Sequence, residues 1–224
     1  KSLILIKLFK KRIPLYCEWE ITDFCNFSCD FCSTLTVHRN KTNFSTTTKE
    51  AIKILDDLTN AGTKFLHFSG GEPTLRPDLS KLINRAKRNG LIVAVTSNGY
   101  GSPKKISKLL DADLIRISLD GVGEKHDIMR KIPGAYNKAM ESINYLIKYN
   151  KKPLITTIIT LNTSYEDMKV KLVMEYTGSP PKRVCLPHAI NLTAIDFPAA
   201  SFAKQQKIDK WADTINTFYS KKEL

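Results

Sequence analysis

Three cysteines stand close together near the start of this 224-residue chain, in the run Cys25-Asn26-Phe27-Ser28-Cys29-Asp30-Phe31-Cys32. Thiolates brought together by so short a loop can hold one face of a cubane iron–sulfur cluster, because cysteine sulfur is the ligand that iron takes in such clusters. The fourth iron would then lack a protein ligand. The alternatives are a zinc site completed by His38, and simple burial, which the polar residues between the cysteines disfavour.

Four further runs place glycines or polar side chains at or just after apolar stretches. They are Ser69-Gly70-Gly71-Glu72-Pro73, Thr96-Ser97-Asn98-Gly99, Arg116-Ile117-Ser118-Leu119-Asp120-Gly121 and His126-Asp127-Ile128-Met129-Arg130. Two glycines let the backbone approach a ligand with no Cβ in the way, and Pro73 fixes the turn that follows. Ser118 has a hydroxyl that needs a partner, and the planar guanidinium of Arg130 suits a carboxylate. Ordinary turns, a satisfied core hydroxyl and a surface salt bridge are the alternatives.

The Cys-x3-Cys-x2-Cys spacing followed by these runs in this order resembles the radical S-adenosylmethionine (SAM) superfamily, over roughly residues 15–192. The chain resembles in particular the radical SAM core shared by molybdenum-cofactor cyclase-like and SPASM-type enzymes. The resemblance implies that Cys25, Cys29 and Cys32 ligate a [4Fe–4S] cluster whose open iron binds SAM. It implies reductive cleavage of SAM to a 5′-deoxyadenosyl radical by an anaerobic oxidoreductase or transferase, with a one-electron donor such as ferredoxin or flavodoxin.

The same resemblance assigns contacts to SAM. The glycine run would contact the methionine amino group, Phe31 would lie beside the adenine, and Glu72 would either join the contact or orient the glycine backbone. The expected SAM-binding residues are Phe31, Gly70, Gly71, Glu72, Pro73, Thr96, Ser97, Asn98, Ser118, Arg130 and Asn162. Thr96, Ser97 and Asn98 could equally serve the substrate. We assign no catalytic residue beyond the cluster ligands, because a lone histidine such as His188 is more often structural.

Strand and helix patterns alternate along the chain and would position these motifs. Strands are expected over 15–22, 65–69, 91–96, 114–119, 154–160 and 183–186. Helices are expected over 48–61, 77–89, 103–110, 136–149, 165–176 and 201–219. Six parallel β/α units predict an α/β fold, a partial (β/α)6 TIM-like barrel with a parallel sheet open on one side. Reactive groups in such folds lie at the carboxyl ends of the strands, where every motif falls.

Length and composition predict one main domain with short appendages. We expect a basic amphipathic lead over residues 1–14, the radical SAM partial barrel over 15–200 and a C-terminal helix over 201–224. The lead either packs across one end of the barrel, as we expect, or rests on a membrane surface. No run approaches the ~20 apolar residues of a spanning helix. Three clustered thiols indicate the reducing cytoplasm and an oxygen-sensitive centre.

Charge and cysteine count bear on the partners. A net charge of +13 attracts anions such as phosphorylated molecules, nucleic acid or acidic lipid headgroups, although lysines spread over many helices also suit a plain solvated surface. Many superfamily members add a cysteine-rich C-terminal extension, whereas this chain has only Cys185 after Cys32. We therefore expect no auxiliary clusters, which weakens a peptide-maturase assignment.

The substrate stays open among a small molecule, a lipid and a peptide, with phosphate-bearing or membrane-associated molecules slightly favoured and nucleic acid not favoured. The competing function is a non-catalytic iron–sulfur or zinc module with a nucleic-acid-binding basic surface. Such a module would not need the glycine run or Ser118 at strand ends.

Overall fold

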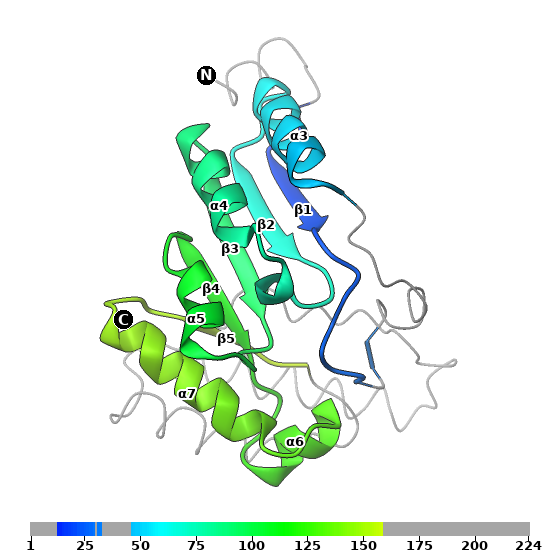
Figure 1. The fold of residues 1–224 in the computed structure, drawn as a ribbon, viewed down its shortest axis with the longest axis vertical. Coiled ribbons are helices and arrows are strands. Elements are labelled where there is room, and N and C mark those ends of the chain that lie inside the picture. The colour runs from blue at the N-terminus through cyan, green and yellow to red at the C-terminus, as the bar shows by residue number, and fades with distance from the viewer. Residues whose placement is uncertain (1–12, 30, 33–45, 159–224) are drawn as a thin grey trace, which may run out of the picture.

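The computed structural model describes residues 13–29, 31–32 and 46–158 (Figure 1). In this part of the chain five parallel strands form one sheet in the order β1-β2-β3-β4-β5, each paired with the next strand in sequence. The strands are β1 (Tyr16–Glu20), β2 (Phe65–Ser69), β3 (Ile92–Ser97), β4 (Leu114–Ser118) and β5 (Leu154–Thr156). The expected parallel α/β sheet is confirmed.

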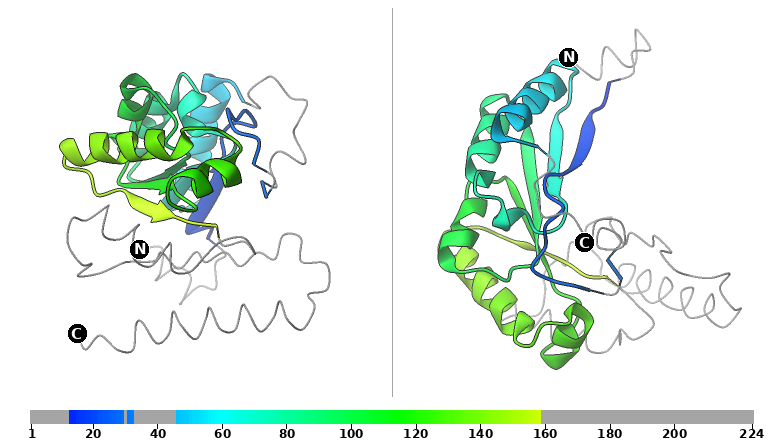
Figure 2. Two further views of the ribbon diagram at one scale, coloured as in Figure 1. Left: turned by 90° about the horizontal axis from the view of Figure 1, so that it is seen from below. Right: turned by 45° about the vertical axis from the view of Figure 1, so that its right-hand side comes forward.

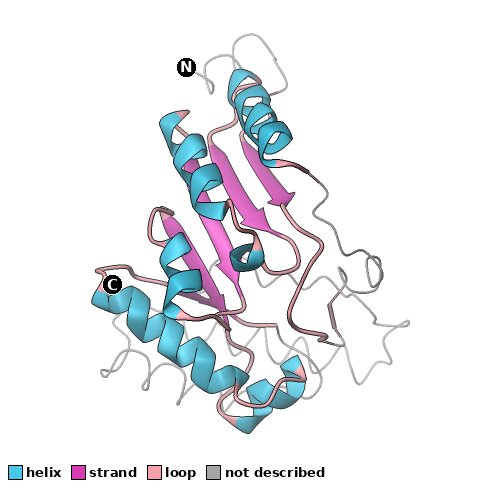
Figure 3. Cartoon of the chain, viewed as in Figure 1, coloured by secondary structure: helices cyan, strands magenta, loops and turns pink. Residues whose placement is uncertain are grey.

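Helices alternate with these strands (Figure 3). They are α3 (Thr48–Asn60), α4 (Leu79–Arg88), α5 (Pro103–Ile106), α6 (Glu124–Arg130) and α7 (Ala135–Lys148), with the 3-10 turns η1 (Pro73–Leu75) and η2 (Ser107–Leu109). The helix expected over 103–110 is divided into α5 and η2, and neither η1 nor α6 was predicted. The expected elements at 165–176, 183–186 and 201–219 and the lead at 1–12 lie outside the described residues.

The helices begin and pack as their sequences predict. At the start of α3 the Thr47 hydroxyl accepts from the Glu50 N–H, and the Glu50 carboxylate accepts from the Thr47 N–H at 2.8 Å, which is a capping box. On α4 the inward residues are Leu79, Leu82, Ile83 and Ala86, all fully buried. Their spacing of three and four residues gives the helix one apolar face towards the sheet.

The two faces of the sheet differ sharply. The helices cover one face (Figure 2), and the core lies between them and buried strand residues such as Leu66, Phe68, Val93 and Ile117. Cys17 and Trp19 of β1 pack against this core. Burial and the neighbouring Glu18 raise the pKa of the Cys17 thiol, which disfavours the reactive thiolate form.

Residues of alternate register point to the other face, because side chains alternate across a strand. None of the described helices covers this second face, which we call the helix-free face (Figure 2). Its register neighbours are Tyr16, Phe65 and Ile92, then Glu18, His67, Ala94 and Leu114, then Glu20 with Ser69, and Thr96 with Arg116 and Leu154. None of the helices within these described ranges is both long enough and apolar enough to cross a membrane.

The Leu82 side chain on α4 provides a test of this packing. Leu82→Ala should lower the free energy of unfolding by about 2–5 kcal/mol because it leaves a cavity in a fully buried site. Leu82→Met, which keeps the volume, should cost less than about 1.5 kcal/mol. Urea unfolding under anaerobic conditions measures both values, and equal losses in the two variants would contradict this placement of α4.

Candidate active site

The loops that carry the motifs meet at one edge of the sheet, as parallel strands require. The loop after β1 holds the three cysteines, and its Asn26 carboxamide oxygen accepts from Asn98 Nδ2, at the end of β3, at 2.8 Å. Cys29 in the same loop lies against Arg130 of α6, whose Nη1 is 4.0 Å from the sulfur. Residues from three separate parts of the sequence therefore converge on the cysteine loop.

The three cysteine side chains gather in a small apolar cluster of their own. Cys29 is buried with Phe27 and Ala135, while Cys25, Cys32, Phe31, Tyr100 and Ile132 pack around them. The thiols lie close enough to affect one another's ionisation. Within the described residues, however, no three cysteine, histidine or acidic side chains converge on a point that one metal ion could occupy. A cubane offers a separate iron to each sulfur, so three thiols that bind a cluster do not have to meet at one point.

Nitrogen donors lie beside the sulfurs of Cys25 and Cys29, the latter beside Arg130 as described above. The Phe27 N–H donates to Cys25 Sγ at 3.4 Å, and Asn98 Nδ2 lies 4.0 Å from the same sulfur. Burial raises the pKa of Cys25 to about 12, and burial also raises the pKa of Cys29, although Arg130 opposes the change. Metal-binding thiols must lose their protons, so these donors and the positive charge fit a site that stabilises thiolates once a cluster arrives.

Gly70 and Gly71 have a role within the protein. A Cβ on Gly70, where φ is +125°, would lie 2.4 Å from the Thr22 carbonyl oxygen, and one on Gly71 would lie 2.2 Å from the Phe24 carbonyl oxygen. The Gly71 N–H donates to the Thr22 oxygen at 2.7 Å. The two glycines therefore let the loop after β2 pair closely with the backbone that leads into Cys25. Their contact with SAM stays a prediction.

The Glu72 carboxylate joins the ends of β2 and β3. It is fully buried and accepts from the Thr74 N–H at 3.0 Å, the Thr74 hydroxyl at 2.6 Å, the Ser97 hydroxyl at 2.8 Å and the Asn98 N–H at 2.7 Å. The Ser97 hydroxyl also accepts from the Gly99 N–H. Glu72 and Ser97, both expected beside SAM, thus have partners within the protein, and Pro73 is buried at the start of η1. The expectation that Glu72 either joins the contact to SAM or orients the glycine backbone stays a prediction.

Arg130 forms a buried ion pair instead of a surface salt bridge. Its Nε donates to Asp120, whose other oxygen accepts from the Ile158 N–H at 2.9 Å. Its guanidinium carbon lies 5.2 Å from the centre of the Phe31 ring, a cation–π contact. Asp120 therefore holds Arg130 between the aromatic ring and the Cys29 sulfur, at the edge where SAM is expected.

The remaining predicted residues lie along the strand ends. Ser118 is buried at the end of β4, and no side chain in the described part of the chain hydrogen-bonds to its hydroxyl. The Thr96 hydroxyl is 2.7 Å from His67 Nε2, and the Asn98 oxygen accepts from the Tyr100 N–H at 2.9 Å. Asn162 and His188 lie outside the described residues.

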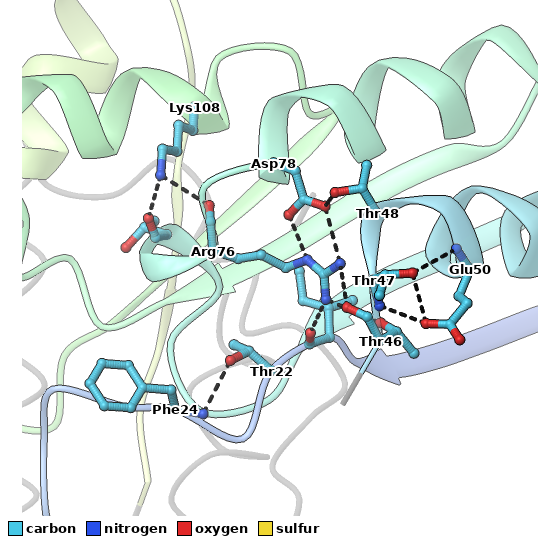
Figure 4. Close-up of polar contacts among 11 residues, drawn as sticks. Thr22, Phe24, Thr46, Thr47, Thr48, Glu50, Arg76, Asp78 and Lys108 are labelled. Carbon is cyan, nitrogen blue, oxygen red and sulfur yellow. Dashed lines mark hydrogen bonds and ion pairs between the residues drawn. The ribbon is translucent and has the colours of Figure 1, made fainter. Parts of the chain in front are cut away.

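Sequence reasoning missed Arg76, which is 1% exposed and joins both ends of the cysteine segment (Figure 4). Its Nη1 donates to the Ile21 carbonyl at 2.7 Å, at the end of β1, and its Nη2 donates to the Thr46 carbonyl at 3.1 Å, before α3. Asp78 accepts from Arg76 Nε at 2.7 Å and from the Thr48 hydroxyl at 2.6 Å. The sequence signal, an arginine and an aspartate two residues apart before a helix, is weak.

His126 was also left without a role. It is fully buried, its Nδ1 accepts from the Asp120 N–H at 3.0 Å, and its Nε2 has no hydrogen-bond partner in the described part of the protein. Burial lowers the pKa of His126 to about 4. The neutral imidazole thus supports the backbone of the aspartate that holds Arg130.

With this geometry in place, comparison with known proteins identifies the family. Residues 19–175 match the family model described as the radical SAM superfamily. The chain belongs to the radical SAM superfamily. Radical SAM proteins are enzymes that use a [4Fe–4S] cluster and SAM, and those of solved structure have the partial TIM-barrel fold.

Individual radical SAM relatives resemble part of the chain. It is 30% identical over 143 residues to the Fe-coproporphyrin III synthase of Methanosarcina barkeri, covering 62% of this chain and 35% of that protein. It is 34% identical over 133 residues to the PqqA peptide cyclase of Bradyrhizobium diazoefficiens, covering 58% and 35%. Streptococcus suis SuiB bound to precursor peptide SuiA shares the fold, with a TM-score of 0.62 at 20% identity over 75% of this chain and 38% of SuiB. The chain spans less than half of each of these proteins.

The Arg76 contacts predict separate effects on stability and on cluster loading. Arg76→Met should lower the free energy of unfolding by about 3–5 kcal/mol, because Asp78 loses its partner in a mostly buried site. Arg76→Lys keeps the charge but cannot reach both carbonyls, so it should recover stability without recovering full iron and sulfide content after anaerobic reconstitution. Arg85→Met is the matched control, because Arg85 pairs with Asp56 on the surface, and it should leave cluster content unchanged. Full loading of the Arg76→Lys protein would refute the positioning role.

The lowered pKa of His126 predicts how stability depends on pH. The imidazole of the unfolded chain takes up a proton near its ordinary pKa of 6.5, whereas that of the folded protein does so only near 4. The contribution of the neutral imidazole to the free energy of unfolding is therefore complete above pH 6.5 and is lost as the pH falls from 6.5 towards 4. Between about pH 7 and about pH 5 the wild type should lose about 2 kcal/mol more than His126→Asn, which can still accept from the Asp120 N–H but does not titrate. Anaerobic urea unfolding at both pH values measures the difference, and parallel losses would contradict a buried neutral imidazole.

Proposed function

We propose that this chain binds a [4Fe–4S] cluster through Cys25, Cys29 and Cys32 and cleaves SAM reductively to a 5′-deoxyadenosyl radical, which abstracts hydrogen from a substrate or adds to it. The arrangement at the sulfurs carries the proposal. Three thiols of one loop stand at the carboxyl edge of a parallel sheet, where Asn98 faces Cys25 and Arg130 faces Cys29. Membership of the radical SAM superfamily supports both cofactors.

When bound, the cluster would supply an electron to SAM at the iron that no cysteine ligates. The contribution of the chain is to hold the sulfurs in place and deprotonated. The Phe27 N–H and the Arg130 guanidinium favour the thiolate forms of Cys25 and Cys29 against burial. The Phe27 ring, which packs edge-on against Tyr100 at 5.4 Å, helps to exclude water from the sulfurs.

We assign SAM to the same edge of the sheet. The Ser118 hydroxyl has no side-chain partner there in the described residues, and Arg130 is held by Asp120 at the level of Cys29. A guanidinium fixed in this way suits the SAM carboxylate, and Phe31, stacked on Arg130, suits the adenine. Glu72 and Ser97 then act through the loops that they hold, without touching the cofactor.

The substrate is proposed as a small molecule, a lipid or a peptide. The peptide option is supported by a relative named as a peptide cyclase and by a neighbour solved with a precursor peptide. The net charge of +13 favours acidic partners, so we propose an acidic one-electron donor such as ferredoxin or flavodoxin. An oxygen-sensitive cluster further suggests the cytoplasm as its location, with residues 1–14 as the segment that would contact a membrane surface.

Formation of 5′-deoxyadenosine tests the proposal. The protein is reconstituted anaerobically with iron and sulfide, mixed with dithionite and SAM, and analysed by chromatography. Cys29→Ala should abolish the product because the cluster loses one of its three ligands. Cys17→Ala is the matched control, since Cys17 packs on the helix-covered face of β1, and it should retain the activity.

Two outcomes would overturn this assignment. Activity that survives Cys29→Ala would refute the ligand set. A fully formed cluster in the wild type that never yields 5′-deoxyadenosine would favour the alternative of a non-catalytic iron–sulfur module.

A further inference from the structure

Arg116 is a charged residue on the helix-free face of the sheet to which the proposed chemistry gives no role. It stands in the middle of β4, in register between Thr96 of β3 and Leu154 of β5, and it is half-buried. Within the described ranges its buried Nε has no hydrogen-bond partner, and no carboxylate forms an ion pair with its guanidinium. A partly buried guanidinium without a counter-ion is costly, because buried charges need partners.

The nearby acids already have partners. Asp120 holds Arg130, and Glu18 accepts from the Ser69 hydroxyl at 3.1 Å and lies 3.4 Å from His67 Nδ1. Glu18 and Glu20 belong to β1, three strands from β4, so about 14 Å separates the two backbones. Among the described residues the charge balance around Arg116 is therefore positive, and no carboxylate of these residues pairs with it on this part of the face.

Arg116 shares its face of the sheet with other polar groups. Burial lowers the pKa of His67, Glu18 opposes this, and Arg116 lowers it further, so the guanidinium lies within electrostatic range of the imidazole. His67 in turn contacts the Tyr16 hydroxyl at 3.1 Å and the Thr96 hydroxyl at 2.7 Å. Thr96 is the register neighbour of Arg116 on β3, and it joins the arginine to a chain of hydroxyl and imidazole groups of the kind that donate to carboxylates or phosphates.

We propose that Arg116 binds an anionic group of the substrate, a carboxylate or a phosphate, on the helix-free face of the sheet. This inference rests on the proposed function and deepens it by naming a chemical feature of the substrate. Ser118, where SAM is expected, lies two residues further along the same face of β4, so the anion would sit about 7 Å below the SAM site. Arg130 already provides a guanidinium at the level of the cysteines, which leaves Arg116 for the second ligand.

Calorimetry with inorganic phosphate tests the site in the reconstituted full chain, with SAM present in excess and at about 0.15 M salt to limit non-specific attraction. The wild type should bind phosphate with a millimolar dissociation constant, and Arg116→Gln should weaken this binding by roughly tenfold or more. Arg116→Lys should recover part of the affinity, since lysine offers charge without the planar fork. Arg88→Gln makes the same charge change on the exposed side of α4 and should bind phosphate like the wild type.

Separate titrations with SAM distinguish the two sources of the anion. Arg116→Gln should bind SAM with an affinity within about twofold of the wild type. Equal phosphate affinity in the wild type and Arg116→Gln would overturn the proposal, and so would a loss of SAM affinity in that variant, which would assign Arg116 to the SAM carboxylate. Because no ion pair of Arg116 within the described residues would be lost, Arg116→Gln should unfold at a temperature no lower than the wild type, and phosphate should raise the unfolding temperature of the wild type alone. Failure of the radical chemistry would appear independently, as absence of 5′-deoxyadenosine from the wild type.

Discussion

The buried guanidinium of Arg76 is the interaction on which the arrangement of the site depends. A positive charge inside the protein must be paired, and Arg76 is satisfied only when the end of β1, the start of α3 and Asp78 meet around it. The chain leaves β1 at the first of these points and enters α3 at the second. The cysteine loop therefore begins at a fixed point, at the carboxyl edge of β1.

Glu72 performs the corresponding task with the opposite charge. Its carboxylate is fully enclosed and collects donors from η1 and from the end of β3, so the strand ends on either side of it are fixed to each other. Through hydrogen bonds to backbone groups, Arg76 and Glu72 thus fix the main chain at the carboxyl edge of the sheet. This backbone positions the side chains that are suited to chemistry, which are the cysteine thiols, Arg130 and the Ser118 hydroxyl. Those side chains are not needed to hold the backbone in place.

The sequence predicts the regular elements well, because long periodic patterns such as those of α3 and α4 record which face is buried. Short elements are less visible. The turn η1 and helix α6 depend on contacts with residues that are distant in the sequence; Lys108, for example, donates to the Thr74 and Arg76 carbonyls. Such contacts cannot be predicted from the local sequence pattern. The cysteine spacing predicts the cluster ligands, yet a sequence does not reveal whether a charged residue is buried. For that reason Arg76 and Arg116 received no role, and the hydrogen bonds that Glu72 and Ser97 make within the protein were not foreseen.

The backbone pairing between β1 and β2 does not stop where the strands end. Beyond Ser69 the ladder continues, with the Gly71 and Glu72 N–H groups donating to the Thr22 and Phe24 carbonyls at 2.7 and 2.8 Å. The main chain is therefore held up to the residue before Cys25 by amide contacts that involve no metal. The backbone that leads into Cys25 would therefore keep its place in a protein that holds no cluster, so this stretch would not have to fold around the metal.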